Sequence, residues 1–124
     1  MKEAILSEKA PRPIGPYSQA IKIGGLVFLS GIIPLRPSCE VLKGNMADQF
    51  RLIIENAKAI LESAGTSMDD VIKVTVYMKD LKDFDAMNEV YASVFRPPFP
   101  ARSTVQVAAL PRNVDIEVDL IAAV

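Results

Sequence analysis

The stretch MADQFRLIIENAKAILESA, Met46 to Ala64, decides the fold class of this 124-residue chain. Its apolar residues recur at steps of three and four, the spacing of one continuous stripe along an α-helix. Asn45 precedes the stretch as a potential N-cap, and Gly65 follows it as a left-handed stop. A helix with a single apolar stripe must cover a second layer. The stripe consists of Phe50, Ile53, Ile54, Ala57, Ile60, Leu61 and Ala64.

The residues before this helix predict part of that second layer. Two β-favouring runs, Ser18–Ile23 and Leu26–Ser30, flank the pair Gly24–Gly25. Because glycine tolerates the positive φ of primed turns, the pattern predicts a tight hairpin. Gly31 is expected to end the second strand, and the proline-rich segment around Cys39 is expected to form an irregular or hairpin-like loop.

The residues after the helix continue the alternation of elements. Lys73–Met78 predicts a half-buried strand, with Ile72, Val74, Val76 and Met78 on the core face. A second helix is predicted from Leu81 or Phe84 to Phe95, with Asp80 and Asp83 as competing caps. Its apolar stripe is Phe84, Met87, Tyr91, Val94 and Phe95.

Two further strands, Ser103–Ala109 and Val114–Val124, are predicted at the C-terminal end. The economical arrangement of all these elements is an α+β two-layer sandwich, a mixed β-sheet with both helices on one face. The other sheet face then lacks a cover, and identical subunits would supply one. Residues expected on this uncovered face include Thr104, Gln106, Glu117 and Ile121.

Composition bounds the class of protein. The length suits one domain spanning residues 1–124, and 50% apolar with 23% charged residues is an ordinary globular balance. A net charge of −1 argues against nucleic acid or an anionic membrane as partner. With one cysteine, Cys39, and no histidine, neither an internal disulfide nor a metal site is expected. The first residues resemble neither a signal peptide nor an anchor, so a cytoplasmic protein is expected.

Arg102 is the first candidate for function. It follows the proline-rich run Pro97–Pro100 at the entrance to a predicted strand. A planar guanidinium held there can grip a small carboxylate at two points, while a carboxylate on a neighbouring strand handles protons. Asp115, Glu117 and Asp119 alternate along the last strand as candidates. Spacing alone leaves open that Arg102 is a solvated charge and that the acids form an exposed strand face.

Four blocks of sequence, in order and with matching spacing, resemble the Rid/YjgF family of reactive intermediate (enamine/imine) deaminases. Short glycine- and proline-containing strings are common, so the specificity lies in the combination, which spans nearly the whole chain. The blocks are IGPYSQA (Ile14–Ala20), VFLSGIIP (Val27–Pro34), NEVYASVF (Asn88–Phe95) and PARSTVQVAALP (Pro100–Pro111), the last followed by VDIEVDLIA.

The resemblance implies a chorismate-mutase-like fold and a homotrimer with clefts between adjacent subunits. It implies hydrolysis of 2-imino acids, such as 2-iminobutanoate and 2-iminopropanoate, to 2-keto acids and ammonia, without cofactor or metal. These imines arise from products released by pyridoxal-phosphate enzymes, so the implied role is metabolite damage control.

The resemblance also implies residue roles. Arg102 matches the family's carboxylate-binding arginine, and Glu117 matches the acid that positions or activates the attacking water. Substrate-binding matches are Tyr17, which lines the cleft, Ser30 with Gly31 beside the ligand, Asn88 on the second helix, and the backbone of Thr104.

Two positions depart from the family pattern. The family often has glutamine where this chain has Ile32, and several deaminases have cysteine where this chain has Thr104. The loss of an amide at Ile32 bears on imine specificity. Alternative functions are a non-catalytic 2-keto-acid-sensing trimer, a ribonuclease or translation inhibitor, and a chaperone-like surface activity. The charge balance disfavours the RNA-directed function.

Overall fold

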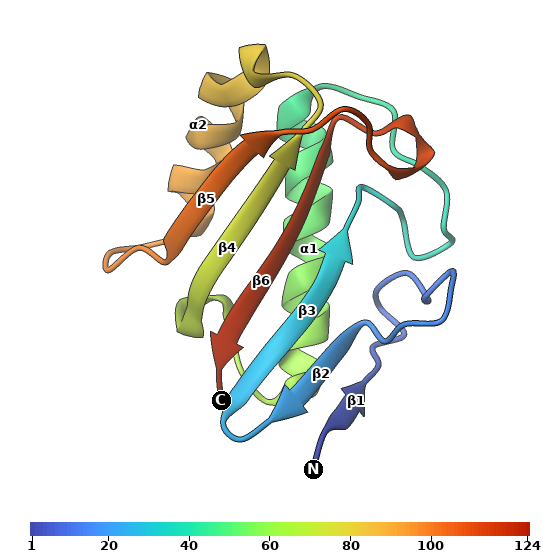
Figure 1. The fold of residues 1–124 in the computed structure, drawn as a ribbon, viewed down its shortest axis with the longest axis vertical. Coiled ribbons are helices and arrows are strands. Elements are labelled where there is room, and N and C mark those ends of the chain that lie inside the picture. Colours follow the sequence, from blue (N-terminus) through green and yellow to red (C-terminus); the bar gives the residue numbers. More distant parts are fainter.

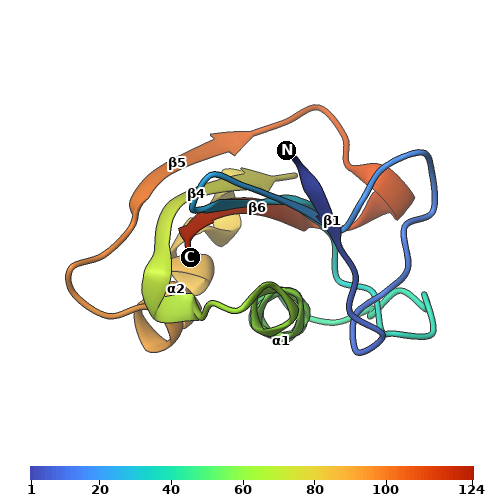
Figure 2. The ribbon, with the colours of Figure 1, turned by 90° about the horizontal axis from the view of Figure 1, so that it is seen from below.

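The computed structural model describes residues 1–124 as one six-stranded sheet with two helices on one side of it (Figures 1 and 2). The order across the sheet is β1-β2-β3-β6-β4-β5. This arrangement confirms the predicted α+β two-layer class with a mixed sheet. The elements are β1 (Glu3–Ile5), β2 (Ala20–Ile23), β3 (Leu26–Ile32), α1 (Met46–Ala64), β4 (Val71–Met78), α2 (Phe84–Val94), β5 (Ala101–Gln106) and β6 (Ile116–Ala123).

Helix α1 has the predicted bounds and the predicted caps. The Asn45 side chain accepts a hydrogen bond from the Asp48 backbone N–H at 2.8 Å. At the other end Gly65 has φ +86°, and its N–H bonds to the carbonyls of Glu62 and Leu61. The apolar stripe is buried against the sheet, so local sequence alone was enough to place this element.

The predicted hairpin is also present. Gly24 and Gly25 both have positive φ, +54° and +85°, and connect the antiparallel strands β2 and β3. The expectation that Gly31 ends β3 is wrong, because the strand continues to Ile32 across a β-bulge. The bulge leaves Ser30 and Gly31 opposite the single residue Asp119 of β6, which re-aims the backbone at this point.

Strand β4 differs from its predicted burial pattern at its start. Ile72 was predicted on the core face but is 48% exposed, whereas Val71 is buried. The pairing of β4 with β6 shifts register between Val71 and Lys73, which rotates Ile72 outward. From Val74 onward the predicted alternation holds.

The C-terminal strands are adjacent in sequence but not in the sheet. Strand β5 is the edge strand of the sheet and pairs parallel to β4. Strand β6 lies between β3 and β4. Helix α2 provides the crossover that parallel pairing requires. The prediction had extended β5 to Ala109, three residues beyond its observed end.

The sheet register corrects two of the four residues predicted for the uncovered face. Thr104 and Gln106 pair with Val76 and Met78, whose side chains are buried beneath the helices, so they face the helix layer. Glu117 and Ile121 lie on the open face, because the alternate β6 positions are the buried ones. The error arose because alternation along β5 shows only which of its residues share a face, whereas pairing with β4 decides which face that is.

Three smaller features complete the fold. Strand β1, which was not predicted, pairs with β2 at the sheet edge. The segment around Cys39 is hairpin-like, since Leu35 and Val41 form an isolated antiparallel bridge. No helix is long and apolar enough to cross a lipid bilayer.

Candidate functional site

The seven residues predicted for the site fall into two groups within one chain. Four of them line a single pocket of about 390 Å³: Tyr17, Ser30, Gly31 and Glu117. The other three, Asn88, Arg102 and Thr104, belong to α2 and β5 at the far edge of the sheet. Each group has its own geometry.

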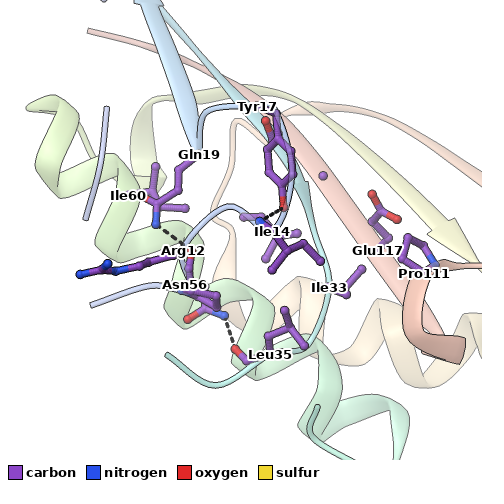
Figure 3. A pocket seen from close by; sticks show the side chains of 14 residues that line it. Arg12, Ile14, Tyr17, Gln19, Ile33, Leu35, Asn56, Ile60, Pro111 and Glu117 are labelled. Carbon is purple, nitrogen blue, oxygen red and sulfur yellow. Dashed lines mark hydrogen bonds between the residues drawn. The ribbon is translucent and has the colours of Figure 1, made fainter. Parts of the chain in front are cut away.

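The pocket lies between the loop before β2, the bulged end of β3, one flank of α1 and the loop before β6 (Figure 3). Six of its fourteen lining residues are hydrophobic, and Glu117 is its only acidic one. Ile32, the position that departs from the family pattern, also lines the pocket. Sequence reasoning did not assign the other nine lining residues to a site: Pro11, Arg12, Ile14, Gln19, Ile33, Leu35, Asn56, Ile60 and Pro111.

Gln19 holds the loop that forms one wall of the pocket. Its buried amide accepts a hydrogen bond from the Ser7 backbone N–H at 2.7 Å and donates to the carbonyls of Ser7 and Pro11 at 3.1 and 2.8 Å. Nearer the rim, the Tyr17 hydroxyl accepts from the Ile14 backbone N–H at 3.2 Å. These bonds tie the proline-rich loop into one conformation over the pocket.

Ser30 ties the end of β3 to the same loop. Its hydroxyl donates to the Ser18 carbonyl at 2.6 Å, and its backbone N–H donates to the Gln19 carbonyl at 3.0 Å. The hydroxyl hydrogen is therefore already engaged, while the oxygen retains acceptor capacity toward the pocket. Ser30 acts first as a structural clamp in this chain.

Glu117 is set apart from the other acids by its surroundings. Burial raises its pKa above the usual 4.5, and the negative charge of Asp119 on the same face raises it further. Asp119 itself accepts a hydrogen bond from the Tyr77 hydroxyl at 2.9 Å. A carboxylate with a raised pKa in a pocket is suited to taking up and returning a proton.

Asn56 is the most deeply buried polar residue of the pocket, with 2% of its surface exposed. Its Nδ2 donates to the Leu35 carbonyl at 2.8 Å, which attaches the loop after β3 to helix α1. It was missed because the prediction treated this part of α1 only as an apolar stripe. A polar residue on such a stripe was the available signal.

Arg102 lies on the helix face of β5 against α2. Its Nη1 donates to Asn88 Oδ1 at 2.7 Å, and its Cζ lies 4.6 Å from the centre of the Tyr91 ring and 5.7 Å from that of Phe84. No acidic side chain lies within 4.0 Å of the guanidinium. The guanidinium is thus oriented by an amide and two aromatic rings but is not neutralised.

Two buried hydroxyls, those of Tyr91 beside Arg102 and of Thr104 on the same strand as Arg102, have no hydrogen-bond partner. Tyr91 is 7% exposed and is packed between Phe50 and Phe95, yet its hydroxyl bonds to nothing. The buried Thr104 hydroxyl also lacks a partner. Burial raises the pKa of Tyr91, although the positive charge of Arg102 opposes the shift.

Arg102 and Glu117 do not meet within one chain. Strand β4 separates β5 from β6, and the two side chains project from opposite faces of the sheet. The expectation of a carboxylate on a strand adjacent to Arg102 is therefore wrong for the isolated chain. Within one chain the candidate residues form two separate groups: a pocket with one carboxylate, and an oriented cation.

Comparison with known proteins identifies a family match and several relatives of similar length. Residues 7–124 match the family described as endoribonuclease L-PSP. The chain is 57% identical over 123 residues to a RutC family protein of Pyrococcus horikoshii, covering 98% of both chains. It is 46% identical over 125 residues to the putative reactive intermediate deaminase TdcF of Escherichia coli, covering 98% of this chain and 97% of TdcF.

The solved structures agree. The crystal structure of Escherichia coli TdcF with bound serine superimposes with a TM-score of 0.92 at 42% identity, covering 98% of each chain. The fold, the order of the four sequence blocks and these identities have one explanation. The chain belongs to the Rid/YjgF family, also described as the endoribonuclease L-PSP or RutC family.

Proposed function

We propose that this protein hydrolyses reactive 2-imino acids, such as 2-iminobutanoate and 2-iminopropanoate, to 2-keto acids and ammonia. Relatives named reactive intermediate deaminases support a deaminase role for the family. The serine bound to the TdcF structure is a small amino acid, close in size to these imino acids.

The observation that carries the proposal is the division of the candidate residues between two faces. Glu117 lies in a pocket without a basic group directed into it, and Arg102 is an oriented cation without an acidic partner. Both halves are completed if a neighbouring copy places its Arg102 edge over the Glu117 pocket. The open sheet face, which carries Phe28 and Val105 among its exposed apolar residues, supports such an assembly.

We further propose that the assembly is a homotrimer, as the family resemblance implies. Light scattering or sedimentation at micromolar concentration should give about three times the monomer mass. A monomer with intact secondary structure would contradict both the trimer and the shared site.

In the proposed reaction the guanidinium of Arg102 binds the substrate carboxylate through two parallel N–H donors. Water attacks the carbon of the C=N bond while Glu117 takes one of its protons. Glu117 then returns that proton to the nitrogen, the C–N bond breaks with its electrons on nitrogen, and ammonia leaves. The remaining hydroxyl gives its proton to the departing nitrogen as the keto group forms, so both protons of the water end on ammonia.

The test is ammonia and keto-acid release from enzymatically generated 2-aminoacrylate, with and without the protein. Acceleration over spontaneous hydrolysis that is lost in Arg102→Ala supports the proposal. Tight 2-keto-acid binding without acceleration would replace it with a sensing function. The description of the matching family also names ribonuclease activity, so RNA cleavage without imine hydrolysis would replace it with that function.

A further inference from the structure

Helix α2 holds one corner of the Arg102 guanidinium and leaves the rest of it free. Nη1 donates to Asn88 Oδ1 at 2.7 Å and lies 3.8 Å from Met87 Sδ. Neither Nε nor Nη2 has a hydrogen-bond acceptor in the chain, and no carboxylate forms an ion pair with the guanidinium. The Nε–Nη2 edge therefore keeps two donors available for a ligand carboxylate.

The Tyr91 ring lies against the face of this guanidinium. Arg102 Cζ is 4.6 Å from the centre of the Tyr91 ring and 5.7 Å from the centre of the Phe84 ring. Attraction between a cation and an aromatic face weakens with distance, so Tyr91 makes the closer and stronger contact. Tyr91 follows Asn88 by three positions on α2, one helical turn, so the ring and the amide hold the guanidinium from the same side of the helix.

The hydrophobic core fixes the position of the Tyr91 ring. Tyr91 is 7% exposed, and its ring centre lies 6.3 Å from that of Phe50 on α1 and 4.4 Å from that of Phe95 at the end of α2. Phe50 and Phe95 are themselves buried. The ring therefore cannot follow a moving side chain, and the orientation of Arg102 is set by packing between the two helices.

A fixed guanidinium binds a carboxylate better than a mobile one. An arginine side chain has many rotamers and must give up this freedom when it grips a ligand at two points. The contact with Tyr91 restricts the side chain before the ligand arrives, so less entropy is lost on binding.

We infer that Tyr91 is a positioning residue for substrate recognition: its ring holds Arg102 so that Nε and Nη2 meet the carboxylate of a 2-imino acid. The inference rests on the proposed function and extends its site by one residue. Tyr91 was predicted only as part of the apolar stripe of α2. Its hydroxyl has no partner in the chain, so the ring carries the role.

The experiment removes the ring and measures affinity for 2-oxobutanoate by calorimetry. Tyr91→Leu keeps an apolar side chain but has no aromatic face, so the Kd should rise by about 5- to 30-fold, the range of a cation–π contact at a partly desolvated site. The KM for the imine should rise by a similar factor with kcat nearly unchanged, because the substrate carboxylate keeps its charge throughout the reaction. Tyr91→Phe restores the aromatic face and should recover the affinity.

Val27→Ala is the matched control for a weakened core. Val27 is fully buried on β3, which β6 and β4 separate from β5, so this change leaves the surroundings of Arg102 intact. Its Kd for 2-oxobutanoate should equal that of wild type. The inference is overturned if folded Tyr91→Leu binds as tightly as wild type, or if Val27→Ala weakens binding as much as Tyr91→Leu does.

A crystal structure of the unaltered protein with 2-oxobutanoate tests the same geometry without any substitution. The carboxylate oxygens should contact Nε and Nη2 while the guanidinium stays on the Tyr91 ring and Nη1 stays bonded to Asn88. A carboxylate bound at Nη1, with the guanidinium moved off the ring, would overturn the inference.

Binding and turnover together separate this inference from the proposed function. If wild type hydrolyses no imine but its affinity for 2-oxobutanoate depends on the ring, the proposed function fails and the positioning role stands. If wild type hydrolyses imines and Tyr91→Leu has the same KM and Kd, the proposed function stands and the positioning role fails.

Discussion

Gly31 lies directly against the carboxylate of Glu117. A Cβ atom built on Gly31 would overlap Glu117 Oε2 and lie 3.0 Å from Cδ. The glycine is required here by space and not by a positive φ, because Gly31 is not among the residues with left-handed backbone. The bulge in β3 thus brings bare backbone against the one acid of the pocket.

Gly31→Ala is expected to displace the Glu117 carboxylate and leave the fold intact, because the atoms that must move end a flexible side chain. Misplacing a reacting group by about 1 Å costs on the order of 10² in rate. We expect kcat/KM to fall by about that factor, measured as ammonia release. Gly44→Ala is the control, since its added Cβ would meet Asp48 only at 3.6 Å, an ordinary contact. Equal activities of the two variants would show that the Gly31 approach has no catalytic consequence.

Glu117→Gln is expected to lower turnover by roughly 10²-fold or more, the scale for loss of a general base. Glutamine keeps the size and hydrogen-bonding capacity but cannot accept a proton from water. Binding of 2-oxobutanoate, measured by calorimetry, should persist because Arg102 is unchanged. Asp115→Asn is the control just before the same strand; its carboxylate accepts a bond from Gln49 at 2.8 Å outside the pocket. If both variants change turnover by the same small amount, Glu117 is a surface acid without a catalytic role.

The raised pKa of Glu117 also predicts how stability depends on pH. The folded protein binds this proton more tightly than the unfolded chain, so the stabilisation is complete below the ordinary value of 4.5 and is lost as pH rises through the folded value. Glu117→Gln should therefore unfold at a higher temperature than wild type at pH 7, with the difference narrowing toward pH 4. The exposed Glu55→Gln on α1 is the control for removal of a carboxylate. If wild type is more stable than Glu117→Gln at pH 7, burial does not raise the pKa of Glu117 as stated here.

Arg102→Ala and Arg102→Lys are both expected to abolish most imine hydrolysis while the oligomer persists. An ammonium cannot present two parallel donors to a carboxylate, so lysine should not rescue alanine. Loss of the guanidinium over the Tyr91 ring should also cost about 0.5–1 kcal/mol of stability. Turnover measures the loss of hydrolysis, light scattering measures the persistence of the oligomer, and urea unfolding measures the change in stability. Turnover near that of wild type in either variant would remove Arg102 from the site.

Tyr91→Phe is expected to leave the free energy of unfolding unchanged or to raise it by about 1–3 kcal/mol, measured in urea. The Tyr91 hydroxyl is buried without a partner, so its removal relieves a desolvation cost and loses no bond. The ring that supports Arg102 is retained. Tyr91→Leu removes the ring and should be destabilising. A Tyr91→Phe variant clearly less stable than wild type would indicate that the hydroxyl has a partner in the assembled protein.

Local sequence was sufficient wherever the physics is local. The period of α1, the Asn45 cap, the Gly65 stop and the two positive-φ glycines of the hairpin depend on neighbouring residues only, and all lie where the sequence predicts. The resemblance to the Rid/YjgF family likewise rests on strings of adjacent residues. These features set the α+β class and direct attention to Arg102 and Glu117.

Tertiary structure decided which residues face one another. The outward rotation of Ile72 depends on the register that β6 imposes on β4, and the facing of Thr104 depends on its parallel pairing with Val76. The same long-range pairings place β4 between Arg102 and Glu117, on opposite faces of the sheet. Alternation within a strand fixes relative facing only along that strand, whereas the absolute face and the neighbour are set by contacts between distant segments. The sequence therefore identified Arg102 and Glu117 as candidates, and only the tertiary structure showed that they lie apart within one chain.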